Sequence, residues 1–238
     1  MVSMRLHRFY INTPLEHTKV IIKDERLIHQ WRDVFRYNVG SEVILFDGSG
    51  NEFDSVIESL GNREAQIRLV EEKQGFIPKN KIHLYISIIK KDNLELVIEK
   101  ATELGVSKVT PIISERSEKK GFNIERAKKI AIEASEQCGR ADIPEIGEVA
   151  SLESVLESNG EIIIFDPSST SPLAPLLAKE RGTENYKLRS TNLFIGPEGG
   201  WSPKELEIFK QKKAQVYSFG PLILRAETVA IVALSKII

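Results

Sequence analysis

Two glycine- and proline-containing turns in residues 193–229 constrain the fold of this chain more than any other feature. The first turn follows an apolar run at residues 193–195 and carries glycine at positions 196, 199 and 200. Glycine accepts positive φ and leaves the backbone bare, so another group can lie directly against it. Ser202, Pro203 and Glu205 then form the pattern of a capping box with proline at the first helical position.

The second turn, residues 219–228, leads into a final apolar helix. Arg225, Glu227 and Thr228 are polar residues in a segment that is otherwise apolar. A strand, a glycine turn and a helix, repeated, form the ligand crevice of an open α/β sheet at the carboxyl ends of its strands. We therefore expect an α/β fold in which these two turns lie together. The helix after Arg225 is apolar nearly all round, so we expect it to be buried.

The overall composition excludes several classes of protein. Net charge is −1, so any nucleic-acid surface must be local. Cys138 is the only cysteine and the four histidines are scattered, so the sequence predicts neither a disulfide nor a metal site. No apolar run approaches the ~18 residues of a membrane span, and no signal peptide is evident. We expect a cytoplasmic protein.

The N-terminal part, residues 1–74, has the pattern of a small β-rich domain with one helix. Residues 24–36 keep helical apolar spacing, and the strand-like runs 43–46 and 52–57 flank a hairpin turn. A third strand is expected at 65–70. Gly48 and Gly50 form the only G-x-G in the chain. A strand rather than a helix follows them, so the turn interpretation is favoured over a dinucleotide site.

From a linker near residue 75 onward, strands alternate with helices. Strands are expected at 82–89, 108–113 and 161–165, and helices after the candidate caps Asp92 and Asn123, the first ending at Gly105. Residues 173–179 have the pattern of a helix and 181–190 of a polar loop. This alternation predicts a mostly parallel sheet with helices on both faces over residues 75–238.

Several polar positions allow a structural or a functional interpretation. The first glycine turn is either a tight strand-to-helix turn or a ligand wall. It lacks the Lys-Ser or Lys-Thr pair of a phosphate-binding loop, so adenosine held through its base and ribose fits better. An unpaired charge near a buried helix is costly. Arg225 and Glu227 therefore either pair with each other or serve a ligand, and Glu227 can also be stabilised by the helix N-terminus. Cys138 is expected to be a core thiol, since residues 84–238 contain no histidine to activate it.

These motifs resemble the RsmE-type 16S ribosomal RNA uridine methyltransferases of the SPOUT superfamily. FIGPEGG from Phe194 and LILRAET from Leu222 resemble the signature of that family, apart from Pro221 and Leu222, where members often carry a basic or small residue. The resemblance covers nearly the whole chain through further blocks, which are LHRFYI from Leu6, HQWRDVFR from His29, LFDGSG from Leu45, KATELGV from Lys100, VTPIISERS from Val109 and ASEQCGR from Ala134.

The resemblance implies a SPOUT methyltransferase domain (75–238) with a C-terminal trefoil knot, and a PUA-like β-barrel RNA-binding domain (1–74). It also implies bound S-adenosylmethionine, a homodimer, and methylation of uridine N3 in 16S ribosomal RNA, either free or within the small ribosomal subunit. The residues expected to hold the cofactor are Ile195, Gly196, Pro197, Gly199, Gly200, Phe219, Leu222 and Leu224.

Arg225 and Glu198 are the candidate catalytic residues. Methyl transfer to the weakly acidic uridine N–H requires in-line positioning and help with the proton or the resulting negative charge. The permanently cationic Arg225 suits the second task, and Glu198 is a candidate for contacts with the cofactor or the base edge. Phosphate contacts are expected from Arg8, Arg36, Arg116 and Arg140.

Three alternative functions compete with uridine N3 methylation. A non-catalytic RNA-binding protein could keep the fold without the chemistry. A SPOUT ribose 2′-O-methyltransferase would use the same cofactor on a different atom. A Rossmann-type oxidoreductase is disfavoured, because no glycine fingerprint marks a first βα turn.

Overall fold

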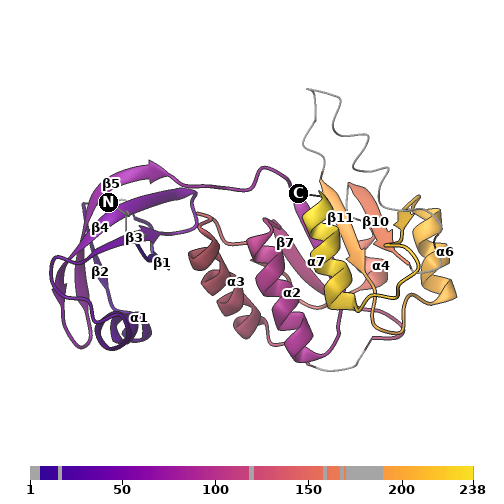
Figure 1. The fold of residues 1–238 in the computed structure, drawn as a ribbon, viewed down its shortest axis with the longest axis horizontal. Coiled ribbons are helices and arrows are strands. Elements are labelled where there is room, and N and C mark those ends of the chain that lie inside the picture. The colour runs from indigo at the N-terminus through magenta and orange to yellow at the C-terminus, as the bar shows by residue number, and fades with distance from the viewer. Residues whose placement is uncertain are drawn as a thin grey trace. The chain divides into compact units, whose positions relative to one another are not determined.

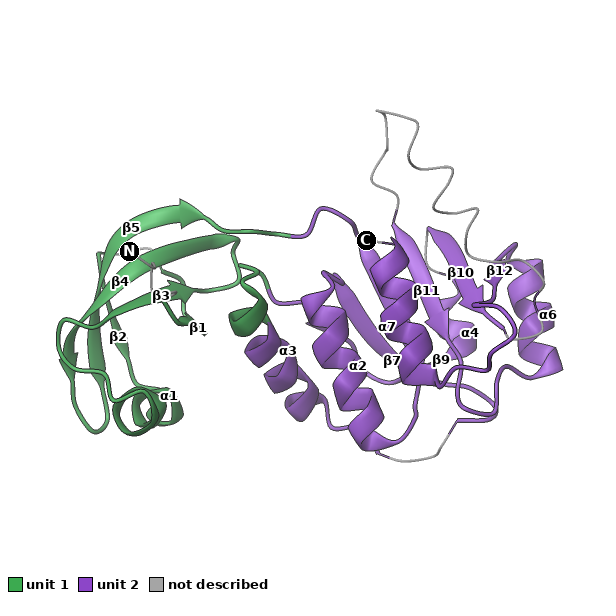
Figure 2. Cartoon of the chain, in the orientation of Figure 1, with its two compact units in different colours: residues 1–77, 135–142 green, residues 78–134, 143–238 purple. Residues whose placement is uncertain are grey.

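The computed structural model describes residues 6–15, 18–117, 121–157, 160–166, 169 and 190–237. These residues form two compact units (Figure 2). Unit 1 comprises residues 1–77 with 135–142, and unit 2 comprises 78–134 with 143–238. The expected helix at 173–179 lies outside the described residues, as does the expected loop at 181–190 except for Ser190.

Unit 1 is built on a curled sheet in which the described strands have the order β1-β3-β4-β5-β2 (Figure 1). The pair β1–β3 is parallel, whereas β3–β4, β4–β5 and β5–β2 are antiparallel. The expected hairpin is confirmed, with both glycines of its turn at positive φ. The strand bounds are β1 Arg8–Tyr10, β2 Lys19–Ile22, β3 Glu42–Phe46, β4 Asn51–Leu60 and β5 Ala65–Gln74.

The helix of unit 1 begins as the sequence predicts but changes its geometry midway. The Asp24 side chain accepts hydrogen bonds from the backbone N–H groups of Arg26 and Leu27 and so caps α1 (Glu25–His29). The chain then widens into a π-helix, η1 (Gln30–Val34). Its fully buried Trp31 packs into a core with Phe9, Ile28 and Leu45. The C-terminal end of α3 (Ile124–Cys138) belongs to the same unit, where Glu136 Oε1 accepts from the backbone N–H of Tyr10 at 2.9 Å.

Unit 2 contains a parallel sheet whose described strands run in the order β12-β10-β11-β6-β7-β8, with β9 paired to β7. This confirms the predicted α/β class. The strands are β6 Ile82–Ser87, β7 Lys108–Ile113, β8 Glu145–Ile146, β9 Ala150–Ser151, β10 Glu161–Phe165, β11 Thr191–Ile195 and β12 Gln215–Tyr217. The helices are α2 Lys91–Glu103, α3, α4 Leu152–Val155, α6 Pro203–Gln211 and α7 Ala226–Ile237.

Helices cover both faces of this sheet, as the alternation of strands and helices predicts. Leu193 and Ile195 point into one core with residues of α2, α3 and α7, whereas Phe194 points into a second core with residues of α4 and α6. This alternation follows from the two-residue period of a strand. On the first face α2 and α7 lie side by side (Figure 1).

The predicted helix ends are mostly confirmed. Ser202 and Glu205 form the complete capping box with Pro203 in the first turn of α6. Asn123 Oδ1 accepts from the backbone N–H of Arg126 at the start of α3, and Gly105 follows α2 with φ +80°. Asp92 as a cap is wrong, because α2 begins one residue earlier and Asp92 lies within its first turn.

The prediction that the last helix is buried nearly all round is wrong for the single chain. Ala226, Ala230, Ala233 and Leu234 are buried, and they lie on the face toward α2 and the sheet. Val229, Ile231 and Val232 are only partly buried, and Thr228 is exposed. One apolar side of α7 therefore remains accessible. No helix among the described residues is long and apolar enough to span a bilayer.

Candidate functional site

The two glycine-containing turns lie together in unit 2 and enclose a cavity of about 510 Å³. Three neighbouring strands, β12, β10 and β11, end at this cavity and contribute Ser218 and Phe219, Phe165 and Asp166, and Ile195 and Gly196. The position matches the general location of ligand sites in open parallel sheets, at the carboxyl ends of the strands. Its volume falls in the range of about 300–1,000 Å³ that small-molecule sites occupy.

Close packing explains why the first turn contains so many glycines. A Cβ atom on Gly196 would lie 3.0 Å from the Trp201 ring, and one on Gly199 would lie 3.3 Å from Cβ of Arg116. Gly200 has φ +67°, which residues with a side chain rarely adopt. The turn therefore contributes bare backbone to the wall of the cavity, and Trp201 and Arg116, which also line the cavity, pack directly against it.

Aromatic rings form much of the remaining wall. Phe165 and Phe219 are stacked with centroids 4.6 Å apart and an interplanar angle of 6°. The Trp201 indole N–H donates to the backbone oxygen of Phe165 at 3.2 Å, which joins the turn after β11 to the end of β10. Apolar walls with a few polar groups are typical of sites for small organic ligands.

Arg116 connects the loop after β7 to the same turn. Its Nη1 donates to the backbone oxygen of Gly199 at 2.9 Å and to that of Trp201 at 3.4 Å. Ser114, earlier in the loop, is buried and hydrogen-bonds through Oγ to Ser87 and Ser117. The sequence placed these loop residues after a strand but did not predict that they would fix the glycine turn.

The structure brings the predicted cofactor residues together. All eight line the cavity, and Glu198, which is exposed, lines it as well. Arg225 does not line the cavity, although its chain neighbours Leu224 and Ala226 do. The Arg225 side chain is 82% exposed and lies 4.0 Å from Glu227, whose buried Oε2 has no hydrogen-bond partner. The structure therefore shows the Arg225–Glu227 pair that the sequence allowed, but with a long separation and with Arg225 largely exposed.

The lining residues that the sequence did not propose as site candidates include Phe165, Asp166, Trp201 and Ser218. Asp166 and Ser218 are polar but buried, with 8% and 7% of their surface exposed. A usable signal existed for Asp166, because it directly follows a buried strand and the carboxyl ends of parallel strands are where ligands bind. No comparable signal marks Ser218, because β12 is short and only partly buried.

The four arginines predicted to contact RNA fall into two groups. Arg8 is ion-paired with Glu52, and Arg140 with Asp142 at 2.8 Å; their side chains are 8% and 2% exposed. A phosphate contact by either would require a buried ion pair to open. Arg36 and Arg116 are exposed.

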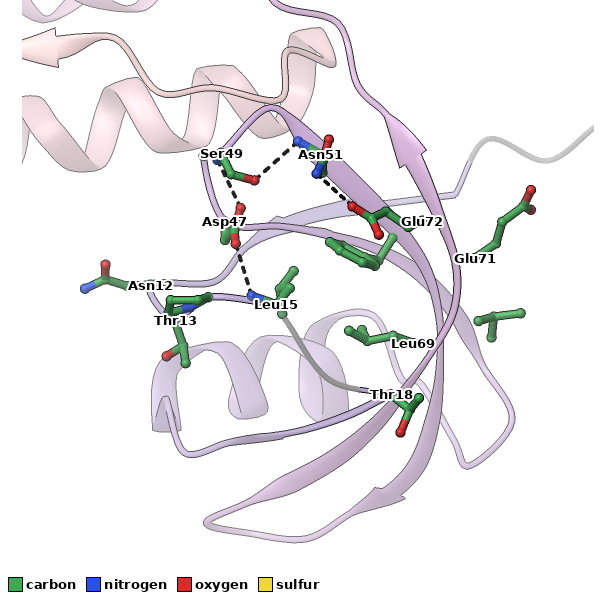
Figure 3. Close-up of a pocket in the computed structure, with 14 residues that line it drawn as sticks. Asn12, Thr13, Leu15, Thr18, Asp47, Ser49, Asn51, Leu69, Glu71 and Glu72 are labelled. Carbon is green, nitrogen blue, oxygen red and sulfur yellow. Dashed lines mark hydrogen bonds between the residues drawn. The ribbon is translucent and has the colours of Figure 1, made fainter.

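A larger hollow of about 920 Å³ lies in unit 1 (Figure 3). Three carboxylates line it, and all three have polar partners. Glu71 is ion-paired with Lys73 at 3.2 Å. Asp47 accepts from the backbone N–H groups of Leu15 and Ser49, and Glu72 accepts from the Asn51 side chain (Figure 3). These hydrogen bonds outweigh burial and hold the pKa of Asp47 below its usual value. The acidic lining disfavours phosphate, so the cavity of unit 2 is the better candidate site.

Comparison with known proteins identifies the class. The family described as RNA methyltransferase domain matches residues 77–238, and the RNA methyltransferase PUA domain matches residues 32–70. The Ribosomal RNA small subunit methyltransferase E of Rickettsia conorii is 32% identical over 98% of this chain and 96% of the relative. The chain belongs to the RNA methyltransferase family, within the group of small-subunit ribosomal RNA methyltransferases E. The resemblance seen in the sequence is thereby confirmed.

Solved structures agree with this assignment. A methyltransferase from Legionella pneumophila, solved in complex with the bound cofactor SAM, is 28% identical, with a TM-score of 0.87 over 98% of this chain and 97% of that chain. A Ribosomal RNA small subunit methyltransferase E from Neisseria gonorrhoeae, solved bound to S-adenosyl methionine, is 24% identical, with a TM-score of 0.83 over 97% and 96% of the two chains. The Neisseria structure therefore shows that this chain has the same fold.

Proposed function

We propose that this protein transfers a methyl group from S-adenosylmethionine to N3 of a uridine in 16S ribosomal RNA. The observation that carries the proposal is the cavity of about 510 Å³ enclosed by the two glycine-containing turns at the carboxyl ends of β10, β11 and β12. The family assignment supports the reaction class, and the SAM-bound Legionella relative supports the cofactor.

The residues of the cavity fit this cofactor. The bare backbone between Gly196 and Gly200 can approach an adenine closely and offer N–H and C=O groups to its edge. The stacked Phe165 and Phe219 supply an apolar wall. Asp166 lies at the end of β10, where a carboxylate can accept hydrogen bonds from ribose hydroxyls. Fit to adenosine thus rests on shape, apolar area and a few placed polar groups.

S-adenosylmethionine, when bound, supplies the electrophilic methyl group. The chain has to hold the uridine in line with that methyl and to stabilise the negative charge that N3 develops as it loses its proton. Arg225 is exposed beside two lining residues, where a cation can meet a base arriving from solvent. Glu198 at the turn is the carboxylate placed to contact the base edge or the cofactor.

RNA contacts are proposed for both units. Arg36 and Arg116 are exposed and can approach phosphates, which position the substrate without reading its sequence. Arg116 would do so with the nitrogens that do not already donate to Gly199 and Trp201. Contacts by Arg8 and Arg140 remain part of the proposal only if RNA displaces Glu52 and Asp142 from their ion pairs. Residues 1–74 are proposed as the RNA-binding domain and 75–238 as the methyltransferase domain.

The proposal has three further parts. The protein forms a homodimer through the second domain, the cofactor is held in a trefoil knot, and the protein acts in the cytoplasm. Leu222 and Ile223, at the cavity, are 74% and 85% exposed, and one apolar side of α7 is accessible. Apolar surface of this kind is typical of a protein interface. The substrate is proposed to be the 16S RNA either free or in the assembled small subunit, and the two can be assayed separately.

The test combines two measurements on the purified protein. Calorimetry with S-adenosylmethionine should give saturable heat, whereas a non-catalytic RNA-binding protein should give none. Mass spectrometry of digested small-subunit RNA after reaction should then find the added methyl on a uracil base. A methyl found on ribose would replace the proposal with 2′-O methylation, and cofactor binding without any methylated RNA would remove the substrate assignment.

A further inference from the structure

Unit 1 carries a surface cluster of three aromatic rings, formed by His7, Phe35 and Tyr37. The Phe35 and Tyr37 rings are stacked, with centroids 5.4 Å apart and an interplanar angle of 12°. The His7 ring lies 4.4 Å from Phe35, and its Nδ1 is hydrogen-bonded to the Tyr37 hydroxyl. Burial raises the pKa of Tyr37, so its phenol stays protonated and can donate to His7 at neutral pH. The three rings therefore hold one another in a fixed arrangement.

Two buried rings support this aromatic cluster from the core. Phe9 packs edge-on against Phe35 at 5.6 Å and against Trp31 at 5.3 Å, and both Phe9 and Trp31 are buried. The outer rings are not covered in the same way, since His7 is exposed and Phe35 and Tyr37 are only partly buried. A rigid aromatic surface that is open to solvent costs little conformational entropy when it binds a flat ligand.

Arg36 lies between Phe35 and Tyr37 in the chain and has a strained backbone conformation. Its φ is +55°, and the backbone N–H of Tyr37 bonds to the carbonyl of Trp31 at 2.9 Å. This bond joins residues six apart in the chain, one more than the 6→1 bond of a Schellman motif, and it follows the wider π-helix η1. Arg36 occupies the left-handed position after the helix, which is usually glycine. An arginine there accepts strain that glycine would avoid, and such strain is common at functional sites.

The Arg36 side chain is available to a ligand. It is exposed, and it makes no hydrogen bond or ion pair with any residue that the structure describes. The nearby Arg32 differs, because it is bound to Asp33 and Asn62. Proteins bind single-stranded nucleic acid by combining an exposed cation with solvent-accessible aromatic rings, through phosphate attraction and base stacking. Arg36 and its chain neighbours Phe35 and Tyr37 offer these groups.

We propose that the aromatic cluster and Arg36 bind an unpaired nucleobase of the RNA and the phosphate next to it. The inference rests on the proposed RNA substrate and adds that unit 1 recognises a single-stranded segment through stacking. An aromatic face accepts any base, so the contact selects unpaired RNA over a duplex rather than one sequence.

Fluorescence anisotropy with a short labelled single-stranded RNA tests the stacking. Tyr37→Leu should weaken binding by about 5- to 150-fold, the range of base–aromatic stacking. Tyr37→Phe is the matched control, because it loses the bond to His7 but keeps the ring, and it should bind within about twofold of the wild type. An abasic version of the same RNA should bind the wild type and Tyr37→Leu alike. Thermal melting should show that both variants are folded.

Arg36→Gly separates the electrostatic contribution from folding. Glycine suits the left-handed position, so the variant should melt no lower than the wild type while binding RNA more weakly. The slope of log affinity against log salt should become shallower by about 0.7, as expected for one phosphate contact to a single strand. Lys213, also at positive φ (57°), provides the control, since Lys213→Gly relieves similar strain far from the aromatic cluster in the sequence and should leave RNA binding unchanged.

Equal RNA affinities for wild type, Tyr37→Leu and Arg36→Gly would overturn this inference. A surface that binds a protein instead of RNA would give this result. The proposed methylation is tested separately by methyl incorporation into small-subunit RNA. A wild type that binds unpaired RNA through this surface but methylates none would overturn the reaction and keep the binding site. If the wild type methylates the RNA but these variants bind RNA as tightly as the wild type, the proposed reaction is kept and the proposed binding site is overturned.

Discussion

The buried carboxylate of Glu205 accepts a hydrogen bond from the backbone N–H of Glu115, 2.9 Å away and 90 residues earlier in the chain. Its other oxygen accepts from the N–H of Ser202 at 2.7 Å and completes the cap of α6. One side chain thus joins the loop after β7 to the start of α6. Arg116, next to Glu115, contacts Gly199, so Glu205 helps to fix both sides of the candidate cofactor cavity.

Replacing Glu205 with Gln should weaken this connection. An amide has one acceptor oxygen, so one of the two backbone N–H groups loses its partner inside the protein, at a cost of about 1–3 kcal/mol. We expect a lower melting temperature and weaker binding of S-adenosylmethionine, measured by calorimetry. Glu207→Gln on the same helix is the control. Glu207 is exposed and its one ion pair, with Lys210, is long at 3.9 Å, so the change should alter neither the melting temperature nor cofactor binding. Equal effects of the two variants would contradict the role of Glu205.

Gly196→Ala tests whether the first turn must present bare backbone. The new Cβ would lie 3.0 Å from Trp201, whose ring is held by its bond to Phe165 and by its edge-on contact with Phe209. Overpacking of this kind costs about 1–3 kcal/mol, and the shifted turn should bind S-adenosylmethionine at least about tenfold more weakly. Gly121→Ala, where a Cβ meets nothing within 4 Å, should leave both stability and cofactor binding unchanged.

Arg225→Ala should slow methyl transfer strongly while cofactor binding persists. Arg225 does not line the cavity, so the affinity for S-adenosylmethionine should stay within a few-fold of the wild type. Loss of a group that stabilises developing charge lowers the rate by about 10²–10³, measured as methyl incorporation into small-subunit RNA at saturating cofactor. Arg126→Ala serves as the control, since that arginine is bound to Glu95 on the surface of the same unit. Unchanged turnover in Arg225→Ala would rule out Arg225 as a catalytic residue.

The stability of unit 2 should fall as the pH is lowered from 6.5 towards 4. Burial, aided by nearby Lys108, lowers the pKa of His83 from 6.5 to about 4 in the folded chain. The unfolded chain therefore takes up a proton in this window that the folded chain does not, and protonation favours unfolding. Chemical denaturation between pH 7 and 5 should show the loss, and His83→Gln should reduce it. The same slope in wild type and variant would exclude His83 as its source.

The sequence was most informative where local chemistry decides structure. The capping box of Ser202 and Glu205 and the hairpin turn at Gly48 and Gly50 follow from rules that act over a few residues. The parallel sheet followed from the alternation of strands and helices. Asp92 was a misplaced cap because helix ends depend on tertiary contacts as well as on side-chain preference.

The π-helical turn at Gln30–Val34 shows a limit of periodicity analysis. Apolar spacing in residues 24–36 predicts a helix but does not distinguish i→i+4 from i→i+5 bonding. The same limit affects burial, since α7 has apolar residues on most sides yet leaves Val232 and Ile231 partly accessible in the single chain. The apolar residues of a helix show which side chains could be buried, but the elements packed against the helix decide which of them are buried.

By itself, the sequence determined the α/β class, the two glycine-containing turns and eight of the residues that line the cavity from them. Only the tertiary structure decided that Arg8 and Arg140 are buried in ion pairs and that Arg225 stands outside the cavity. It alone added Asp166, Trp201 and Glu205 to the surroundings of the site. The physical reason is range, because turns and caps depend on neighbours in the chain, whereas burial and charge pairing depend on residues that meet only when the chain is folded.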